Sequence, residues 1–335
     1  MIQGILLNCR KDSKSANGPI PLEFYVPTIK LLVFGFLLLV LSLPAHTEPT
    51  DKKVLIVYQK SQGFSQQLID QLQASLPKQG YLVSKMILKP QQLDLLTIRK
   101  QSLLIAIGSQ TTKALLEANI NTPILSALIP RHISNSLNLK YPNRKNWSRL
   151  LIDQPLIRQF HLITALLGSN KKAGILLGPY TKDLTKSLQD ISVKTALKIN
   201  IEEIKNTDEL TSSLKALSNK SNILLTLPDP VVYNKSTIRG VLLLAYRNRL
   251  PIIGFSQAYV RAGAIAAIYS EPKQISEQII NISTRYFIKN KFEKNEYYPD
   301  IFSVALNKNI ARSLGIKLAT NKAIIQQIKK AEMQQ

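Results

Sequence analysis

The stretch LTLPDPVVYNKSTIRGVLLLAYRNRLPIIGFSQAYVRAGAIAAI (residues 225–268) contains a strand, a helix and a second strand in close succession. An apolar run over residues 223–227 predicts a buried strand, residues 236–247 predict a helix, and residues 251–255 predict the next strand. Short apolar runs suit parallel strands that are covered on both faces, and the helix between them supplies a right-handed crossover. This stretch therefore predicts a doubly wound α/β sheet.

The same alternation extends through the chain in two sets. The first predicts strands at 54–58, 81–88, 103–107 and 123–129, with helices at 63–78 and 111–119. The second predicts strands at 150–152, 173–177, 199–204, 223–227 and 251–255, with helices at 155–167, 182–197, 208–217 and 236–247. The polar, turn-rich residues 130–148 predict a boundary between the sets. We expect two Rossmann-like, doubly wound lobes joined by a hinge, with ligand bound at the carboxyl ends of their strands.

Composition limits the classes of partner. The 335 residues include a single cysteine, Cys9, so neither a disulfide framework nor a cysteine metal site is expected. The net charge is +23, from 44 Lys and Arg against 21 Asp and Glu, but the basic residues are scattered along the chain. This pattern favours a solvated basic surface over nucleic-acid binding.

Residues 31–43 form an uninterrupted apolar run directly after Lys30. The run is shorter than the roughly 20 residues that a membrane-spanning helix needs. Pro44 and the small residues that follow it are typical of a signal-peptidase site. We predict that residues 1–47 are a secretory signal with an unusually long lead, and that the protein is exported to the periplasm. The alternative is an uncleaved anchor that holds the protein to the membrane.

No catalytic motif stands complete in the sequence. Residues 254–258, GFSQA, resemble a nucleophile elbow around Ser256, but in that fold the catalytic histidine follows the serine in the chain. All three histidines, His46, His132 and His161, precede Ser256. No metal-ligand spacing or nucleotide fingerprint is present either. We therefore expect no enzyme activity, no cofactor and no metal.

Several motifs carry a family resemblance that covers residues 53–320. They are Ile107-Gly108-Ser109-Gln110, Leu227-Pro228-Asp229, Leu250-Pro251-Ile252, Phe255-Ser256, residues 260–264 (VRAGA), residues 304–307 (VALN) and residues 311–316 (ARSLGI). Together they resemble the ABC-transporter solute-binding family that includes tryptophan- and tyrosine-type binding proteins. The resemblance implies a fold like that of the type I periplasmic binding proteins, a small-molecule ligand and an ABC permease as partner. The loops 59–64 and 127–134 depart from the family pattern, so the identity of the ligand is not carried over.

The resemblance also implies a discontinuous division of the chain. Residues 53–149 and 255–290 are assigned to the first lobe, and residues 150–250 and 300–320 to the second. The hinge crossings then fall near residues 149, 254 and 300, and residues 321–335 are a basic C-terminal tail.

This division and the strand ends select ten candidate ligand contacts. They are Ser109, Gln110, Thr111, Asp229, Tyr233, Asn234, Ser256, Gln257, Tyr259 and Arg261. The helix start at Ser109 suits a ligand carboxylate, or Ser109 simply caps its helix. Asp229 pairs with a ligand amine or caps the next turn, and Tyr233 stacks on a planar ligand. Arg261 clamps an acid, or is solvated or bridges the domains.

Three functions remain open. The leading hypothesis is a monomeric periplasmic subunit that delivers a small polar, amino-acid-like metabolite to an inner-membrane ABC importer. The second is a sensory or accessory binding protein whose partner is a receptor. The third is a hydrolase that uses Ser256.

Overall fold

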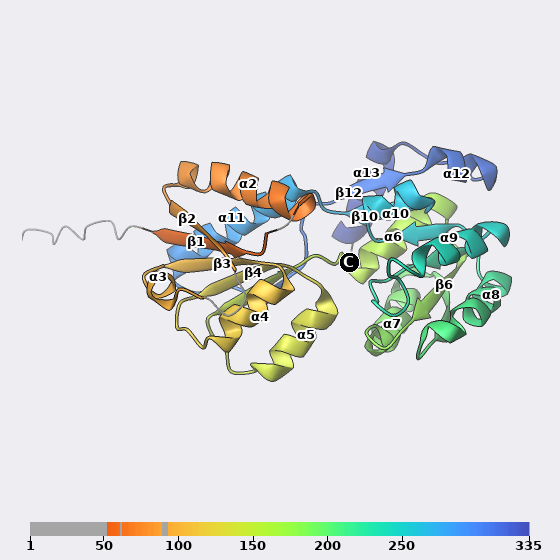
Figure 1. Cartoon of the computed structure of the whole chain (residues 1–335). Helices are drawn as coiled ribbons and strands as arrows, with labels where there is room; N and C mark the ends of the chain where they lie inside the picture. Colours follow the sequence, from red (N-terminus) through yellow and green to blue (C-terminus); the bar gives the residue numbers. More distant parts are fainter. Residues whose placement is uncertain (1–51, 61, 89–92, 335) are drawn as a thin grey trace, which may run out of the picture. The chain divides into compact units, whose positions relative to one another are not determined.

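The computed structural model describes residues 52–60, 62–88 and 93–334, which belong to one compact unit of the chain (Figure 1). The predicted signal peptide, residues 1–47, lies outside the described residues. Within the described ranges, no helix has both the length and the apolar character needed to cross a membrane.

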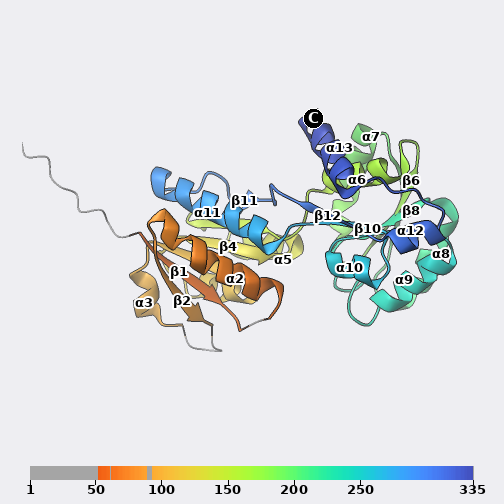
Figure 2. The same cartoon turned by 90° about the horizontal axis from the view of Figure 1, so that it is seen from above.

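The first sheet has six strands in the order β11-β5-β4-β3-β1-β2, and all its neighbours pair in parallel. Its strands are β1 (Lys53–Tyr58), β2 (Leu82–Ile87), β3 (Leu103–Ile107), β4 (Ile124–Ile129), β5 (Trp147–Leu151) and β11 (Glu296–Tyr297). Helices α2 (Phe64–Ser75) and α11 (Pro272–Lys289) lie side by side on one face (Figure 2). The short helix η2 (Pro77–Gln79) follows α2, and α3 (Leu95–Arg99), α4 (Ser109–Glu117) and α5 (Arg131–Lys140) cover the other face.

Strand β1 shows why both faces of this sheet must be covered. Val54 and Ile56 pack into the core under α2 and α11, while Leu55 and Val57 pack into the core on the opposite face. Successive side chains of a strand point to opposite faces, so an uninterrupted apolar run needs a helical layer on each side.

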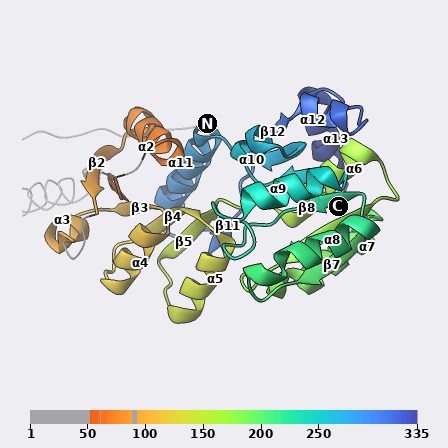
Figure 3. The same ribbon diagram turned by 45° about the vertical axis from the view of Figure 1, so that its right-hand side comes forward.

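The second sheet has the order β12-β10-β9-β8-β6-β7, and only the β10–β12 pair is antiparallel. Its strands are β6 (Lys172–Leu177), β7 (Lys198–Glu203), β8 (Ile223–Leu225), β9 (Ile252–Gly254), β10 (Ala266–Tyr269) and β12 (Ser303–Leu306). Helices α6 (Leu156–Leu167), α7 (Thr185–Thr195), α12 (Lys308–Ser313) and α13 (Asn321–Met333) contribute to the core on one face, with η3 (Lys182–Leu184) before α7. On the other face lie α8 (Leu210–Lys220), α9 (Ile238–Arg247) and α10 (Gln257–Ala262), with η4 (Thr207–Glu209) before α8 (Figure 3).

The chain passes between the two sheets at residues 152–155, 270–271 and 298–302. The predicted crossing near residue 254 is wrong, and so is the assignment of residues 255–269 to the first lobe. Strand β10 pairs with β9 and β12, because its apolar run is buried as an inner strand of the second sheet. The predicted basic tail forms α13, whose Ile324 and Ile328 are buried in the core beside α6.

A hydrogen-bond network connects the three crossings. Gln154 in the first crossing donates to Ser270 in the second at 2.9 Å, and Ser270 donates to the carbonyl of Ile301 in the third at 2.6 Å. One guanidinium nitrogen of Arg158 donates to Gln154 and to the carbonyl of Pro299, both at 2.8 Å. We call these five residues the crossing network.

Candidate functional site

A cavity of about 280 Å³ lies where strands of both sheets end. It is lined by Pro130, Arg131, His132, Ile152, Asp153, Gln154, Leu156, Gln159, Thr181, Leu184, Leu227, Pro228, Phe255, Ser256 and Tyr298. These residues follow the carboxyl ends of β4, β5 and β11 in the first sheet and of β6, β8 and β9 in the second. Open α/β sheets bind ligands at this edge, so the cavity is the candidate site.

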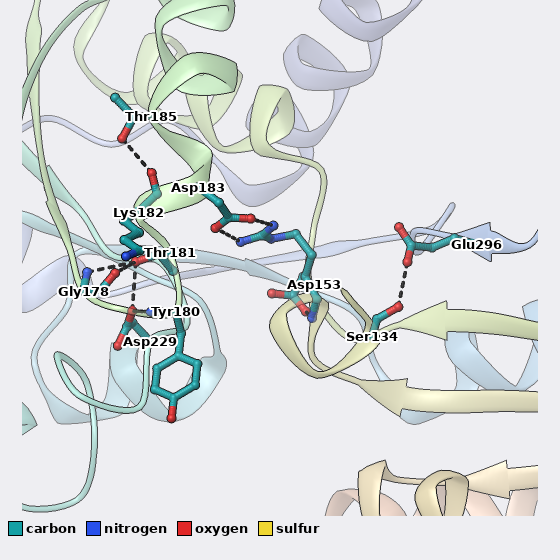
Figure 4. Close-up of polar contacts among 11 residues, drawn as sticks. Ser134, Asp153, Gly178, Tyr180, Thr181, Lys182, Asp183, Thr185, Asp229 and Glu296 are labelled. Atoms are coloured by element: carbon teal, nitrogen blue, oxygen red, sulfur yellow. Dashed lines mark hydrogen bonds and ion pairs between the residues drawn. The ribbon is translucent and has the colours of Figure 1, made fainter. Parts of the chain in front are cut away.

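An ion pair joins the two lobes at the cavity (Figure 4). Arg131, the first residue of α5, donates from its two terminal nitrogens to the two carboxylate oxygens of Asp183 in η3, at 2.8 and 3.0 Å. Such bidentate pairs are geometrically specific. The hydrogen bond from Arg131 lowers the pKa of Asp183 below its ordinary value. The guanidinium of Arg131 is thus already engaged by a carboxylate of the protein.

Asp153 brings a second carboxylate to the cavity, directly after β5. Its Oδ2 accepts a hydrogen bond of 2.8 Å from the backbone N–H of Arg131. Burial raises the pKa of Asp153, and the neighbouring Arg131 counteracts this only in part. Desolvation disfavours the charged form of a carboxyl group, so Asp153 is a carboxylate that a further positive charge would stabilise.

Gln159 lies on α6 and lines the cavity with a side chain that is almost wholly buried. The residue is 4% exposed, and its Oε1 has no hydrogen-bond partner within the described part of the chain. A buried acceptor without a donor costs about 1–3 kcal/mol. Gln159 is therefore an unsatisfied acceptor within the wall of the cavity.

His132 follows Arg131 on α5, and the centroids of its ring and the Tyr180 ring lie 5.2 Å apart in a T-shaped arrangement. Burial lowers the pKa of His132, so its imidazole is neutral at pH 7. A neutral imidazole carries one acceptor nitrogen, which makes His132 a hydrogen-bonding group of the cavity but not a charged one.

Of the ten residues predicted as ligand contacts, Ser256 lines the cavity. Ser256 caps α10 by position, but its hydroxyl makes no capping hydrogen bond. The hydrolase hypothesis requires a base within hydrogen-bond reach of this hydroxyl. His132 lines the same cavity, yet across the described ranges no hydrogen bond joins it to Ser256.

The buried carboxylate of Asp229 holds the loop of Thr181, which is a residue of the cavity lining (Figure 4). Its Oδ2 accepts from the backbone N–H of Tyr180 and from the hydroxyl of Thr181, both at 2.9 Å. Its Oδ1 accepts from the backbone N–H of Val231 at 2.9 Å. The capping role, rather than pairing with a ligand amine, matches these contacts, because Asp229 holds its own turn and the loop that carries Thr181.

Tyr233, Asn234 and Tyr259 lie outside the cavity lining. Tyr233 is buried with its ring edge toward Phe255 at 6.3 Å, and burial raises the pKa of its hydroxyl. The ring centroids of Tyr259 and Phe255 lie 4.3 Å apart, and burial raises the pKa of the Tyr259 hydroxyl to about 12. Asn234 accepts from the backbone of Ser236 and so shapes the turn before α9. The two tyrosines position Phe255, which does line the cavity.

The remaining predicted contacts also lie outside the lining. The cap of α4 is Gly108, at φ 89°, and not Ser109. Thr111 is buried and Gln110 is exposed on the same helix. Arg261 is exposed and donates to Gln257 at 3.0 Å.

The residues that sequence reasoning missed are Arg131, His132, Asp153, Gln159 and Tyr298. The first two were hidden because residues 130–148 were interpreted as a polar boundary, whereas α5 begins at Arg131 and β5 at Trp147. The sequence position of these residues could have identified them, because polar residues directly after the buried strands β4 and β5 lie at the carboxyl edge of the sheet, where ligands bind.

Comparison with known proteins places this site in context. A family model described as ABC transporter substrate-binding protein matches residues 90–327. A search of curated proteins finds no match.

Solved structures resemble the chain over most of its length. An ABC domain in complex with L-Trp from Streptococcus pneumoniae has a TM-score of 0.57 at 17% identity, covering 83% of this chain and 98% of that one. A conserved domain protein from Vibrio cholerae has a TM-score of 0.57 at 21% identity, with the same coverage. A ligand-free, open substrate-binding protein with adhesive properties from Clostridium difficile has a TM-score of 0.64 at 17% identity, covering 81% and 97%. The predicted fold, two doubly wound α/β lobes of the type I periplasmic binding protein kind, is confirmed.

Proposed function

Because the chain belongs to the ABC transporter substrate-binding protein family, we propose that it is the periplasmic solute-binding subunit of an ABC importer. In this role it captures a small polar molecule in the cavity between its lobes and presents the closed form to a permease in the inner membrane. The protein acts as a monomer and performs no chemistry on the ligand.

The observation that carries the proposal is the cavity itself. It draws its lining from the ends of strands in both sheets, so a ligand in it contacts both lobes at once. Its wall also includes Gln159, whose buried Oε1 has no hydrogen-bond partner among the described residues. A ligand that touches both lobes binds the closed state more tightly than any open one, and this difference drives closure.

The crossing network supports a link between binding and hinge motion. Gln154 lines the cavity and also donates to Ser270 in the second crossing. Occupation of the cavity therefore acts directly on a residue that connects the segments about which the lobes turn.

A ligand screen by thermal unfolding tests the proposal. A molecule present at 100 times its dissociation constant adds about 2.7 kcal/mol to the stability of the protein. We expect a shift with one chemical class of small metabolite, and a smaller radius of gyration in solution scattering with the same compound. The matched control is Ser256→Trp, which places an indole ring in the cavity from a half-buried position. A full metabolite screen without any shift would refute solute binding.

A second experiment separates the importer from the sensory alternative. Cells that lack this chain lose uptake of the identified ligand if it serves an importer. If uptake is unchanged and a transcriptional or behavioural response to the ligand is lost, the partner is a receptor.

A further inference from the structure

We propose that the cavity selects a ligand with a protonated amine on an apolar body, in preference to an amino acid that carries both an amine and a carboxylate. This inference rests on the proposed solute-binding function and names the chemical class of its ligand.

The charged side chains at the cavity favour a ligand cation over a ligand carboxylate. The guanidinium of Arg131 is bound on both terminal nitrogens by Asp183, so the pair is neutral together. Among the described residues Asp153 has no comparable partner, and it accepts a hydrogen bond from the backbone N–H of Arg131. Among the cavity-lining residues, Arg131 is the sole Lys or Arg side chain. The cavity therefore offers a carboxylate to a ligand cation and has no uncommitted basic side chain for a ligand carboxylate.

The hydrogen-bonding groups of the lining also match an amine better than a carboxylate. An ammonium group carries three N–H donors and no acceptor. The lining residues supply acceptors to match, namely the carboxylate of Asp153, one nitrogen of the neutral His132 and, within the wall, the Oε1 of Gln159, which has no hydrogen-bond partner among the described residues. A carboxylate brought to the same place would leave the Gln159 oxygen without a donor and would repel Asp153.

The apolar part of the lining indicates that the rest of the ligand is apolar. Most of the lining is apolar or aromatic, contributed by Ile152, Leu156, Leu184, Leu227, Phe255 and Tyr298. A volume of about 280 Å³ is near the lower end of the roughly 300–1,000 Å³ that small-molecule sites span. The aromatic rings also favour a cation, since a ring face attracts positive charge.

The overall charge of +23 does not oppose this selection at the site. At physiological salt, exposed charges are screened over about 8 Å, whereas buried groups are screened far less. The groups that face the ligand within the cavity therefore decide its affinity.

Matched pairs that differ by one carboxylate test the inference on the whole protein by titration calorimetry. The pairs are tryptamine and tryptophan, tyramine and tyrosine, phenethylamine and phenylalanine, and isoamylamine and leucine. We expect at least one amine to bind at least tenfold more tightly than its amino acid. Amino acids that equal or exceed all the amines, or amines that all fail to bind, would overturn the inference.

Two substitutions assign the effect to the named groups. Asp153→Asn keeps an acceptor for the Arg131 N–H but removes the charge, and it should weaken the best amine at least tenfold. Asp183→Asn removes the negative charge that balances the Arg131 guanidinium and should narrow the preference for the amine over its amino acid at least threefold. An amine affinity unchanged in Asp153→Asn would overturn the inference even if the amine binds.

The outcome also separates this inference from the proposed function. If an acid or a sugar binds, and Ser256→Trp abolishes that binding, the amine preference is wrong while solute binding stands. If no compound binds at all, the proposed function fails as well.

Discussion

Arg158 lies at the centre of the crossing network, and its replacement should cost more stability than the loss of any surface ion pair. Its side chain is 7% exposed and pairs with Glu332 of α13, the two atoms Nε and Oε1 lying 2.6 Å apart. Arg158→Met removes the guanidinium group that lies over the Phe302 ring, and it leaves Glu332, the Gln154 side-chain oxygen and the Pro299 carbonyl without this donor.

The magnitude follows from the burial of each acceptor. The side-chain oxygen of Gln154 and the carbonyl of Pro299 are buried acceptors. Removing the donor from each of them lowers the free energy of unfolding by about 1–3 kcal/mol. Glu332 is 25% exposed and can regain water, so its share is close to the roughly 0–1 kcal/mol of a surface pair. The expected loss is about 2–7 kcal/mol, a range that includes the roughly 3–5 kcal/mol usually lost when one partner of a buried ion pair is removed.

Equilibrium unfolding in urea measures this loss. Trp147 is the single tryptophan, and its fluorescence should be compared with far-UV circular dichroism to establish whether the transition is two-state. Arg285→Met is the matched control, because Arg285 is 63% exposed and pairs with Glu293, whose side chain is 25% exposed like that of Glu332. We expect the control to lose less than about 1 kcal/mol. If the free energies of unfolding of Arg158→Met and Arg285→Met differ by less than about 1 kcal/mol, the crossing network does not stabilise the fold.

Further outcomes follow from single contacts. The pKa of Asp183 lies below its ordinary value of 3.8, so the Arg131 pair contributes stability above that pH and loses it as the pH falls through the lowered pKa. Asp183→Asn should therefore flatten the decline in melting temperature as the pH falls below 3.8, and an unchanged decline would contradict the pairing. A Cβ on Gly178 would lie 2.6 Å from the nearest side chain, so Gly178→Ala should destabilise by about 1–3 kcal/mol in urea unfolding. Gly240→Ala, in open space within α9, should instead stabilise by about 0.5–1 kcal/mol, and equal effects would refute the packing argument. Activated esters should be hydrolysed no faster by the wild type than by Ser256→Ala, and a rate that disappears in the variant would establish the hydrolase.

The alternation of apolar strands and helices predicted both sheets because buried parallel strands leave an unmistakable local pattern. Strand β10 was not assigned to the second sheet because its place depends on pairing with β9 and β12. This pairing forms in the tertiary structure and leaves no local pattern in the sequence. Helix α5 was missed because its sequence RHISNSLNLK is polar on most positions and buries only Ser134 and Leu137.

The candidate site was harder to predict than the fold. Asp229 and Tyr233 were selected for their chemistry, but the structure commits them to internal support of the cavity wall. Arg131, Asp153 and Gln159 meet only after two separately wound sheets have folded, so no local motif connects them. Ser256 was found because it stands directly at the end of a predicted strand.

Native mass spectrometry of the purified protein after exposure to a metabolite extract tests the central claim most directly. We predict that the wild type retains one small molecule per chain and that Ser256→Trp, with its cavity filled, retains none. A wild type that retains nothing, or retention that is unchanged in Ser256→Trp, would contradict solute binding in this cavity.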